Sequence, residues 1–242
     1  MAKRPAKPWF DWRENARELA IVIFGVLIAL LAQQAVDDWG WKQRVKAAET
    51  AIRRELLFDD GPEVYQRVAV HPCAQERLQG IRAAIEADRS RAEVGRLVDG
   101  YKVVFVTYDT IAYDGANASQ VSTRMTQDEL ELYTVPYTML PQMDALNRQE
   151  AIDLARLRGF KRAGGPLTQA EESQILSAAE ALRNGDNSIY TAAMFALPAI
   201  RRIGELDPKR VAFYMDVARS AYGNCIKDAP PDLPNARVAE KS

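Results

Sequence analysis

Hydrophobic residues are concentrated near the start of this 242-residue chain. Residues 19–32 contain no charged or strongly polar side chain, and the uncharged stretch continues to Val36, giving 18 residues in all. A helix needs roughly 17–25 apolar residues to cross the hydrocarbon core of a bilayer. The pattern predicts a transmembrane helix over residues 18–38, with a cleaved signal peptide or a buried amphipathic helix as the alternatives.

A cleaved signal peptide fits this segment poorly, because cleavage needs small residues at positions −3 and −1. Cleavage after Ala29 or Ala32 would leave a leucine at −3, and cleavage after Ala35 would leave a glutamine there. All four tryptophans flank the segment instead: Trp9, Trp12, Trp39 and Trp41. Indole rings favour the headgroup regions of a bilayer. We therefore expect a retained membrane anchor with an interfacial tryptophan belt.

Small residues recur on one face of the expected membrane helix, at Gly25, Ala29 and Ala32. In lipid, this spacing lets two helices approach closely. The spacing suggests self-association or docking on the membrane helix of another protein, although small residues are common in membrane helices in general.

The orientation of the helix cannot be read from basic residues, because five flank it on each side. Long domains are translocated with little regard to charge, and two cysteines suit an oxidising compartment. We expect residues 1–17 to be a cytoplasmic tail and the main domain to lie in the periplasm or another exterior compartment. Cys73 and Cys225 would then form a disulfide, the alternative being two unrelated buried thiols.

Beyond the anchor, apolar positions recur with helical spacing, which predicts an all-α protein in which the membrane helix continues into a bundle over residues 39–226. The first helix should end near residues 58–64, and Cys73 should lie at the start of a later helix. Residues 101–110 resemble a strand in composition but have no comparable run to pair with, so helix or irregular structure is favoured.

Local signals predict several later boundaries. Capping boxes begin helices at Thr126 and Thr168, prolines interrupt or kink the helix near residues 136–141, and residues 183–188 end another helix. Asp207 should cap the last helix and Gly223 should end it. Residues 227–242 hold three prolines and little apolar content, and we expect a disordered tail.

Composition argues against several classes of function. The chain has 32 basic and 33 acidic residues, so no basic field exists to attract nucleic acid. It contains a single histidine, His71, and none of the familiar catalytic, phosphate-binding or zinc-binding motifs. We expect no catalytic residues, metal site or cofactor, and hence a protein that is not an enzyme.

The most unusual stretch of the folded part lies between residues 108 and 117. Aromatic and polar residues lie there together with Gly115, and they could line a small pocket. The residues that could line such a pocket are Tyr108, Asp109, Tyr113, Asp114 and Asn117. The alternative is an amphipathic helix whose tyrosines fill the core.

Residues 17–56 carry an apolar span, a short polar segment with two tryptophans and a charged helix. This arrangement resembles a group of uncharacterised bacterial single-span membrane proteins, and residues 108–116 and 129–137 are similar to a recurring stretch of such proteins. The resemblance implies a bacterial, single-span, mostly helical protein without an assigned activity, and it supplies no catalytic residues. Together with the topology expected above, this gives a bacterial inner-membrane protein whose main domain lies in the periplasm.

The sequence therefore favours a membrane-anchored helical protein that works by interaction. Such a protein would be an accessory, scaffold or self-assembling subunit that contacts the lipid bilayer and either another membrane protein or a second copy of itself. The alternative is a membrane-tethered domain that binds a small ligand, similar to a sensor.

Overall fold

The structure is a computed structural model that describes residues 12–104, 106–162 and 165–227. Within these ranges the chain is all-α, with helices joined by short connections and no strand. It divides into two compact units, residues 1–47 and residues 48–242. Trp9 and the expected tail from residue 228 onward lie outside the described residues.

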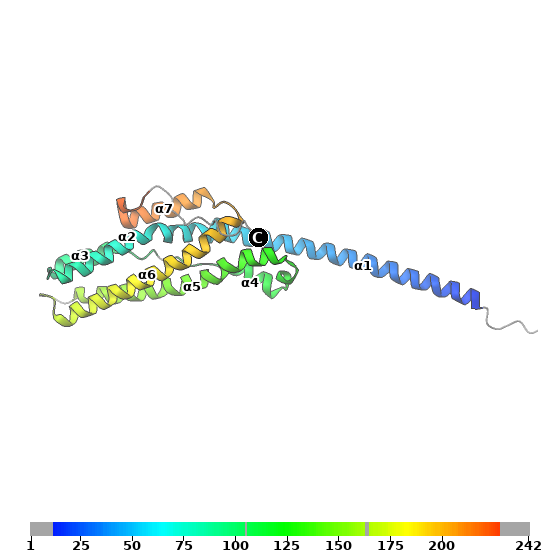
Figure 1. The fold of residues 1–242 in the computed structure, drawn as a ribbon, viewed down its shortest axis with the longest axis horizontal. Coiled ribbons are helices and arrows are strands. Elements are labelled where there is room, and N and C mark those ends of the chain that lie inside the picture. The colour runs from blue at the N-terminus through cyan, green and yellow to red at the C-terminus, as the bar shows by residue number, and fades with distance from the viewer. Residues whose placement is uncertain (1–11, 105, 163–164, 228–242) are drawn as a thin grey trace, which may run out of the picture. The chain divides into compact units, whose positions relative to one another are not determined.

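The first unit is built from α1 (Trp12–Arg54), whose last seven residues belong to the second unit. Figure 1 shows α1 as an unbroken helix. The apolar side chains of residues 19–36 are exposed, including Phe24 at 66% and Leu31 at 65%. No residue in its most apolar window of 18 is buried. Among the described residues, this is the one helix long and apolar enough to cross a membrane, which makes it a candidate single span.

The second unit is a helical bundle around two long helices, α5 (Gln127–Arg158) and α6 (Gln169–Ile203), which run antiparallel. Figure 1 shows α2 (Gly61–Glu86) along α6, with α3 (Arg91–Gly100) and α7 (Pro208–Tyr222) beside α2. A short helix, α4 (Ile111–Ala118), follows residues 101–104 and 106–110, which are neither helix nor strand and which we call the extended segment. Shorter helical turns complete the unit: η1 (Glu55–Asp60), η2 (Val121–Arg124), η3 (Gly159–Arg162) and η4 (Gly223–Cys225).

The expected end of the first helix near residues 58–64 is wrong, because the backbone stays helical from Ala16 to Glu86. The π-helical turn η1 takes the place of a break just before Pro62, which has no N–H to donate. The Leu57 and Phe58 carbonyl oxygens in this turn accept from the Asp207 N–H and from Arg210 Nε instead. Gly61 permits this path. A β-carbon there would lie 2.4 Å from the Leu56 carbonyl oxygen and 2.5 Å from Leu206 Cδ2.

Two other expected boundaries are also wrong. Cys73 lies inside α2 rather than at a helix start, because the helix continues through Pro72. Residues 183–188 do not end a helix, because α6 runs through them. Its buried positions repeat at alternating spacings of four and three, and Asp186 occupies one of them. Packing of this stripe against α2 and α5 overrides the weak helix propensity of the intervening asparagines and glycine. α5 likewise continues through Pro136 and Pro141.

Predictions that rest on local chemistry are confirmed. Thr126 and Thr168 each accept a hydrogen bond from the backbone N–H three residues later, in complete capping boxes. Asp207 caps α7 in the same way, and Gly223 ends that helix with φ of 62°. Residues 101–104 and 106–110 form no strand. Side chains bind carbonyl groups there instead: Arg67 donates to Val104 O and Asn147 to Val106 O. These bonds replace the ladder that a strand would need.

Candidate functional site

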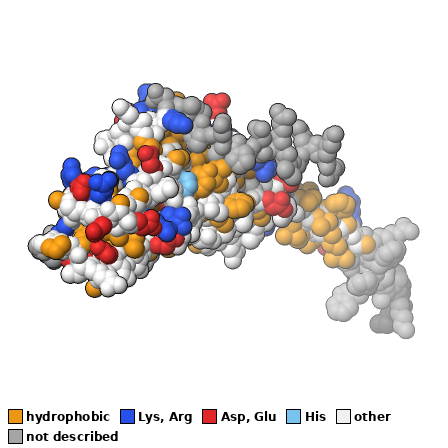
Figure 2. Space-filling view, turned by 60° about the vertical axis from the view of Figure 1, so that its left-hand side comes forward, with side chains coloured by type: hydrophobic (Ala, Val, Ile, Leu, Met, Phe, Trp, Pro, Cys, Tyr) orange, Lys and Arg blue, Asp and Glu red, His pale blue; other side chains and the backbone are white. Residues whose placement is uncertain are grey.

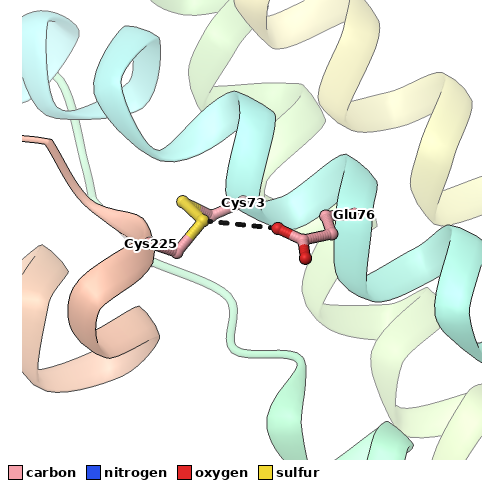
Figure 3. Close-up of a disulfide and its surroundings, with 3 residues drawn as sticks. All are labelled: Cys73, Glu76 and Cys225. Atoms are coloured by element: carbon pink, nitrogen blue, oxygen red, sulfur yellow. Dashed lines mark hydrogen bonds between the residues drawn. A yellow bond between two sulfur atoms is a disulfide. The ribbon is translucent and has the colours of Figure 1, made fainter.

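The two cysteines are joined by a disulfide within the second unit. Cys73 on α2 is bonded to Cys225 of η4, with the two Cα atoms 5.8 Å apart, as Figure 3 shows. Glu76 Oε2 lies 3.7 Å from Cys225 Sγ. This is a contact rather than a donated hydrogen bond, because a disulfide sulfur carries no hydrogen. The bridge fastens the chain just after α7 to the middle of α2, so the expected pairing is present.

The five residues considered for a ligand pocket are distributed between interior and surface. Tyr108 is buried, whereas Asp109, Asp114 and Asn117 are exposed. Tyr113 stacks on Tyr137 of α5 with ring centroids 4.5 Å apart. Only Tyr108 therefore points into the bundle, and a ligand pocket formed by all five remains a prediction.

The residues expected to act in the membrane lie on α1 as far as the structure describes them, and the side chain of Trp12 lies outside the described part. A β-carbon on Gly25 would meet no atom within 4 Å, and Ala29 and Ala32 are exposed. Trp39 is exposed, and Trp41 carries the Arg44 guanidinium 5.0 Å from its ring centroid. Their packing and interfacial roles remain predictions.

An ionic network that no sequence pattern predicted lies inside the bundle. Arg67 of α2 is only 2% exposed, and its Nη2 lies 2.8 Å from Glu150 Oε2 of α5. Glu150 Oε1 accepts a hydrogen bond of 2.5 Å from the Tyr101 hydroxyl. Asp186 Oδ1 of α6 lies 3.9 Å from Arg67. One buried cation thus links α2 to both long helices and to the extended segment.

His71 extends this network toward the surface. Its Nδ1 lies 2.7 Å from Asp186 Oδ2, and Gln75 Nε2 donates to the same oxygen, also over 2.7 Å. Tyr190 stacks on the imidazole with ring centroids 4.0 Å apart. Figure 2 shows the histidine, pale blue, reaching the surface among apolar and charged side chains. A histidine held by a buried carboxylate has the geometry of an acid–base pair, but here Arg67 shares that carboxylate.

A second polar group, which we call the carboxylate cluster, consists of Glu55, Asp60 and Glu63. Each side chain is bonded to a different part of the bundle. Glu55 accepts from the Ala112 N–H at 2.9 Å and from the Tyr137 hydroxyl at 2.7 Å. Asp60 Oδ1 accepts from the Asp109 N–H at 3.1 Å, and Glu63 Oε1 accepts from the Tyr214 hydroxyl.

Two members of the carboxylate cluster have strongly raised pKa values. Burial raises the pKa of Asp60 from 3.8 to about 8, assisted by the charges of Glu55, Glu63 and Asp109. Burial raises the pKa of Glu63 from 4.5 to about 7, against the lowering effect of the Tyr214 hydrogen bond. Both groups therefore hold protons at a pH where exposed carboxyl groups have lost them.

The described residues offer no arrangement of three or more His, Cys, Asp or Glu side chains that could hold a metal ion. They do form surface grooves. One, of about 640 Å³, is lined by residues at the end of α6, on α7 and on α2, among them Tyr65, Arg201, Leu206, Val211 and Met215. Another, of about 770 Å³, lies at the start of α3 and includes Arg89, Arg91 and Arg96.

Comparison with known proteins found no family model, no curated protein and no solved structure that matches this chain. The function must therefore be argued from the exposed apolar helix, the disulfide and the two buried polar clusters.

Proposed function

We propose that this protein is a single-pass bacterial inner-membrane protein whose helical domain lies in the periplasm and works by binding another protein. In this role it is an accessory, scaffold or self-assembling subunit of a membrane complex, and it performs no catalysis. The observation that carries the proposal is the long apolar helix α1, whose side chains are exposed along its most apolar window.

Exposed apolar surface of this length is unfavourable in water, at roughly 25 cal/mol per Å². Lipid covers such a helix without any protein partner, and it satisfies the apolar side chains while the backbone bonds internally. This supports an anchor. The aromatic residues that follow the apolar stretch, Trp39 and Trp41, suit the membrane interface.

The disulfide supports an oxidising location for the folded domain. Disulfides persist in the periplasm and are rare in the cytoplasm. The bond between Cys73 and Cys225 joins segments that are 152 residues apart, so it stabilises the whole domain and is not a local redox pair. A periplasmic domain places the short N-terminal segment in the cytoplasm.

The buried charges support binding rather than catalysis. Arg67 pairs with Glu150, which also accepts from Tyr101. Asp186 binds His71 and Gln75, and Tyr190 stacks on His71. A network in which most members are engaged specifies how helices pack. It leaves few polar groups for a substrate.

The proposal is tested by purifying the tagged full-length protein from its native membrane in mild detergent. We expect a stoichiometric partner or a defined homo-oligomer, identified by mass spectrometry and native mass. A substitution of Gly25→Ile with Ala29→Ile should disrupt the complex, because it removes the close-approach face. Ala20→Ile makes a similar change on the other side of α1 and should leave the complex intact. A monomer with no partner would contradict the proposal.

The groove beside Tyr65 favours a second candidate function, binding of a small ligand. Its volume of about 640 Å³ lies within the roughly 300–1,000 Å³ of small-molecule sites. Apolar side chains line it, and Arg201 lies 5.7 Å from the Tyr65 ring centroid, which suits an apolar ligand with an anionic group. Native mass spectrometry should then show a bound molecule that Val211→Trp removes.

A further inference from the structure

The carboxylate cluster lies at a junction of the second unit. Its members come from the π-helical turn η1 and the start of α2, and they bind the extended segment, α4, α5 and α7. The same turn holds the start of α7 by two further contacts. Its Leu57 carbonyl accepts the Asp207 N–H at 3.0 Å, and Asp59 pairs with Arg210 at 2.9 Å. π-helical turns are rare and are frequent at functional sites.

Several polar atoms around the cluster are buried without a protein partner. They are Asp60 Oδ2, Glu63 Oε2 and Arg67 Nε. Tyr108 and Asn147 lie beside them and interact with each other. Asp60, Arg67 and Asn147 are each at most 2% exposed. Acceptors therefore outnumber donors among these buried atoms, and an unpaired buried acceptor is unfavourable. A proton on Asp60 or Glu63 converts an acceptor into a donor and relieves this imbalance.

We propose that the carboxylate cluster is a pH-sensitive latch, closed when Asp60 and Glu63 are protonated and opened by their ionisation. In the closed state the neutral carboxyl groups hold the extended segment, α4 and α7 against α2. In the open state two added negative charges, close to Glu55 and Asp109, repel one another and draw in water. The segments bound to the cluster then separate from α2, while the α5–α6 pair stays packed.

The charged and titratable groups that face the cluster from each packed element favour opening when Asp60 and Glu63 ionise. From η1 come Glu55 and Asp59, and from the extended segment come Tyr108 and Asp109. From α5 comes Tyr137, and from α7 come Arg210 and Tyr214. Arg67 is the cation on α2, but it is engaged by Glu150, and Arg210 is engaged by Asp59. Negative charge therefore predominates around Asp60.

The two raised pKa values agree in sign. Both folded-state values, about 8 for Asp60 and about 7 for Glu63, exceed the ordinary values of 3.8 and 4.5. Stability from these groups is complete below pH 4 and is lost as the pH rises through about 7 to 8. The latch therefore closes in mild acid and opens in mild alkali, the reverse of ordinary acid denaturation.

The test is hydrogen exchange measured by mass spectrometry on the full-length protein in detergent micelles. Labelling times are scaled so that intrinsic exchange is equal at pH 6 and pH 9. Wild type is compared with Asp60→Asn, which keeps the acceptor for the Asp109 N–H and cannot ionise, and with Glu63→Gln. Asp114→Asn is the matched control, because Asp114 is an exposed carboxylate of the neighbouring α4.

We expect wild type and Asp114→Asn to lose protection at least tenfold at pH 9 in peptides covering residues 101–118 and 207–222. Asp60→Asn should keep most of this protection, Glu63→Gln should keep part of it, and peptides from α6 should not change in any variant. Equal protection of wild type at both pH values would overturn the latch. An equal loss in Asp60→Asn would also overturn it, because opening would then not depend on ionisation of Asp60.

Discussion

The disulfide is the strongest single constraint on the second unit. Cys73 and Cys225 are 152 positions apart. In the chain-entropy model, a loop of this length lowers the free energy of the folded state relative to the unfolded state by about 5 kcal/mol. Removing both sulfurs with Cys73→Ala and Cys225→Ala should therefore reduce the free energy of unfolding by roughly 3–5 kcal/mol. For a domain of this size, that corresponds to a fall in Tm of about 6–20 °C.

The assay is thermal and urea unfolding followed by far-ultraviolet circular dichroism, in detergent, with and without a reducing agent. Reduced wild type and the double variant should unfold at similar temperatures, both below oxidised wild type. The bridge also fixes the end of α7, which is otherwise held by packing of Ala218 and Tyr222 and by the Tyr222 hydrogen bond to Lys102 O. A decrease in the free energy of unfolding of less than about 1 kcal/mol in both experiments would contradict this prediction, because closing the loop would then stabilise the domain very little.

Three further predictions concern the interior of the bundle. Asp60→Asn should raise the free energy of unfolding at pH 7 by on the order of 3 kcal/mol and change it little at pH 4, because only the wild type must bind a proton to fold. Urea titrations at both pH values measure this difference, and equal effects at the two pH values would contradict it. Gly61→Ala should lower Tm, because its β-carbon would lie 2.4 Å from a carbonyl oxygen. Gly185→Ala, in open space on α6, should raise the free energy of unfolding by about 0.5–1 kcal/mol. The opposite order of the two Tm values would be inconsistent with the structure. Arg67→Met should lower the free energy of unfolding by about 3–5 kcal/mol, because it leaves buried carboxylates without their cation. Adding Glu150→Leu to Arg67→Met should recover much of that loss in chemical unfolding. No recovery would show that the Arg67–Glu150 pair is not the main interaction.

Features that depend on neighbouring residues could be predicted from the sequence. The capping boxes need only Thr126 with Glu129 and Thr168 with Glu171, and the Asp207 cap needs only the Arg210 N–H. The apolar stretch of α1 is equally local, and the all-α class follows from helical spacing. The disulfide could be inferred because the chain has only two cysteines, although Cys73 was expected at the wrong place in its helix.

Features that depend on partners far along the chain could not be predicted. Arg67 and Glu150 are 83 residues apart, and His71 and Asp186 are 115 apart. In the sequence, Asp186 lies among residues typical of a turn, so residues 183–188 read as a helix end. Its place in the buried stripe of α6 becomes evident only when α2 supplies the partners. One signal was present: continuing the four–three spacing from Leu182 to Ile189 places a single carboxylate in an apolar row.

The carboxylate cluster was hidden for a similar reason. Asp59 and Asp60 are neighbours in the sequence, and nothing local distinguishes the residue at the surface from the buried one. The structure separates them, because Asp59 pairs with Arg210 at the surface while Asp60 turns inward to the Asp109 N–H. Tyr108, one of the five candidate pocket residues, lies beside this cluster, so the unusual composition near it did mark a polar part of the interior.

The proposed topology is tested most directly by counting free thiols in the protein recovered from carbonate-washed native membranes, denatured without reduction. We expect that the protein stays in the washed membrane and that neither Cys73 nor Cys225 is labelled. Two labelled cysteines per chain would contradict an exterior, disulfide-bonded domain. Release of the protein by the carbonate wash would contradict the membrane anchor.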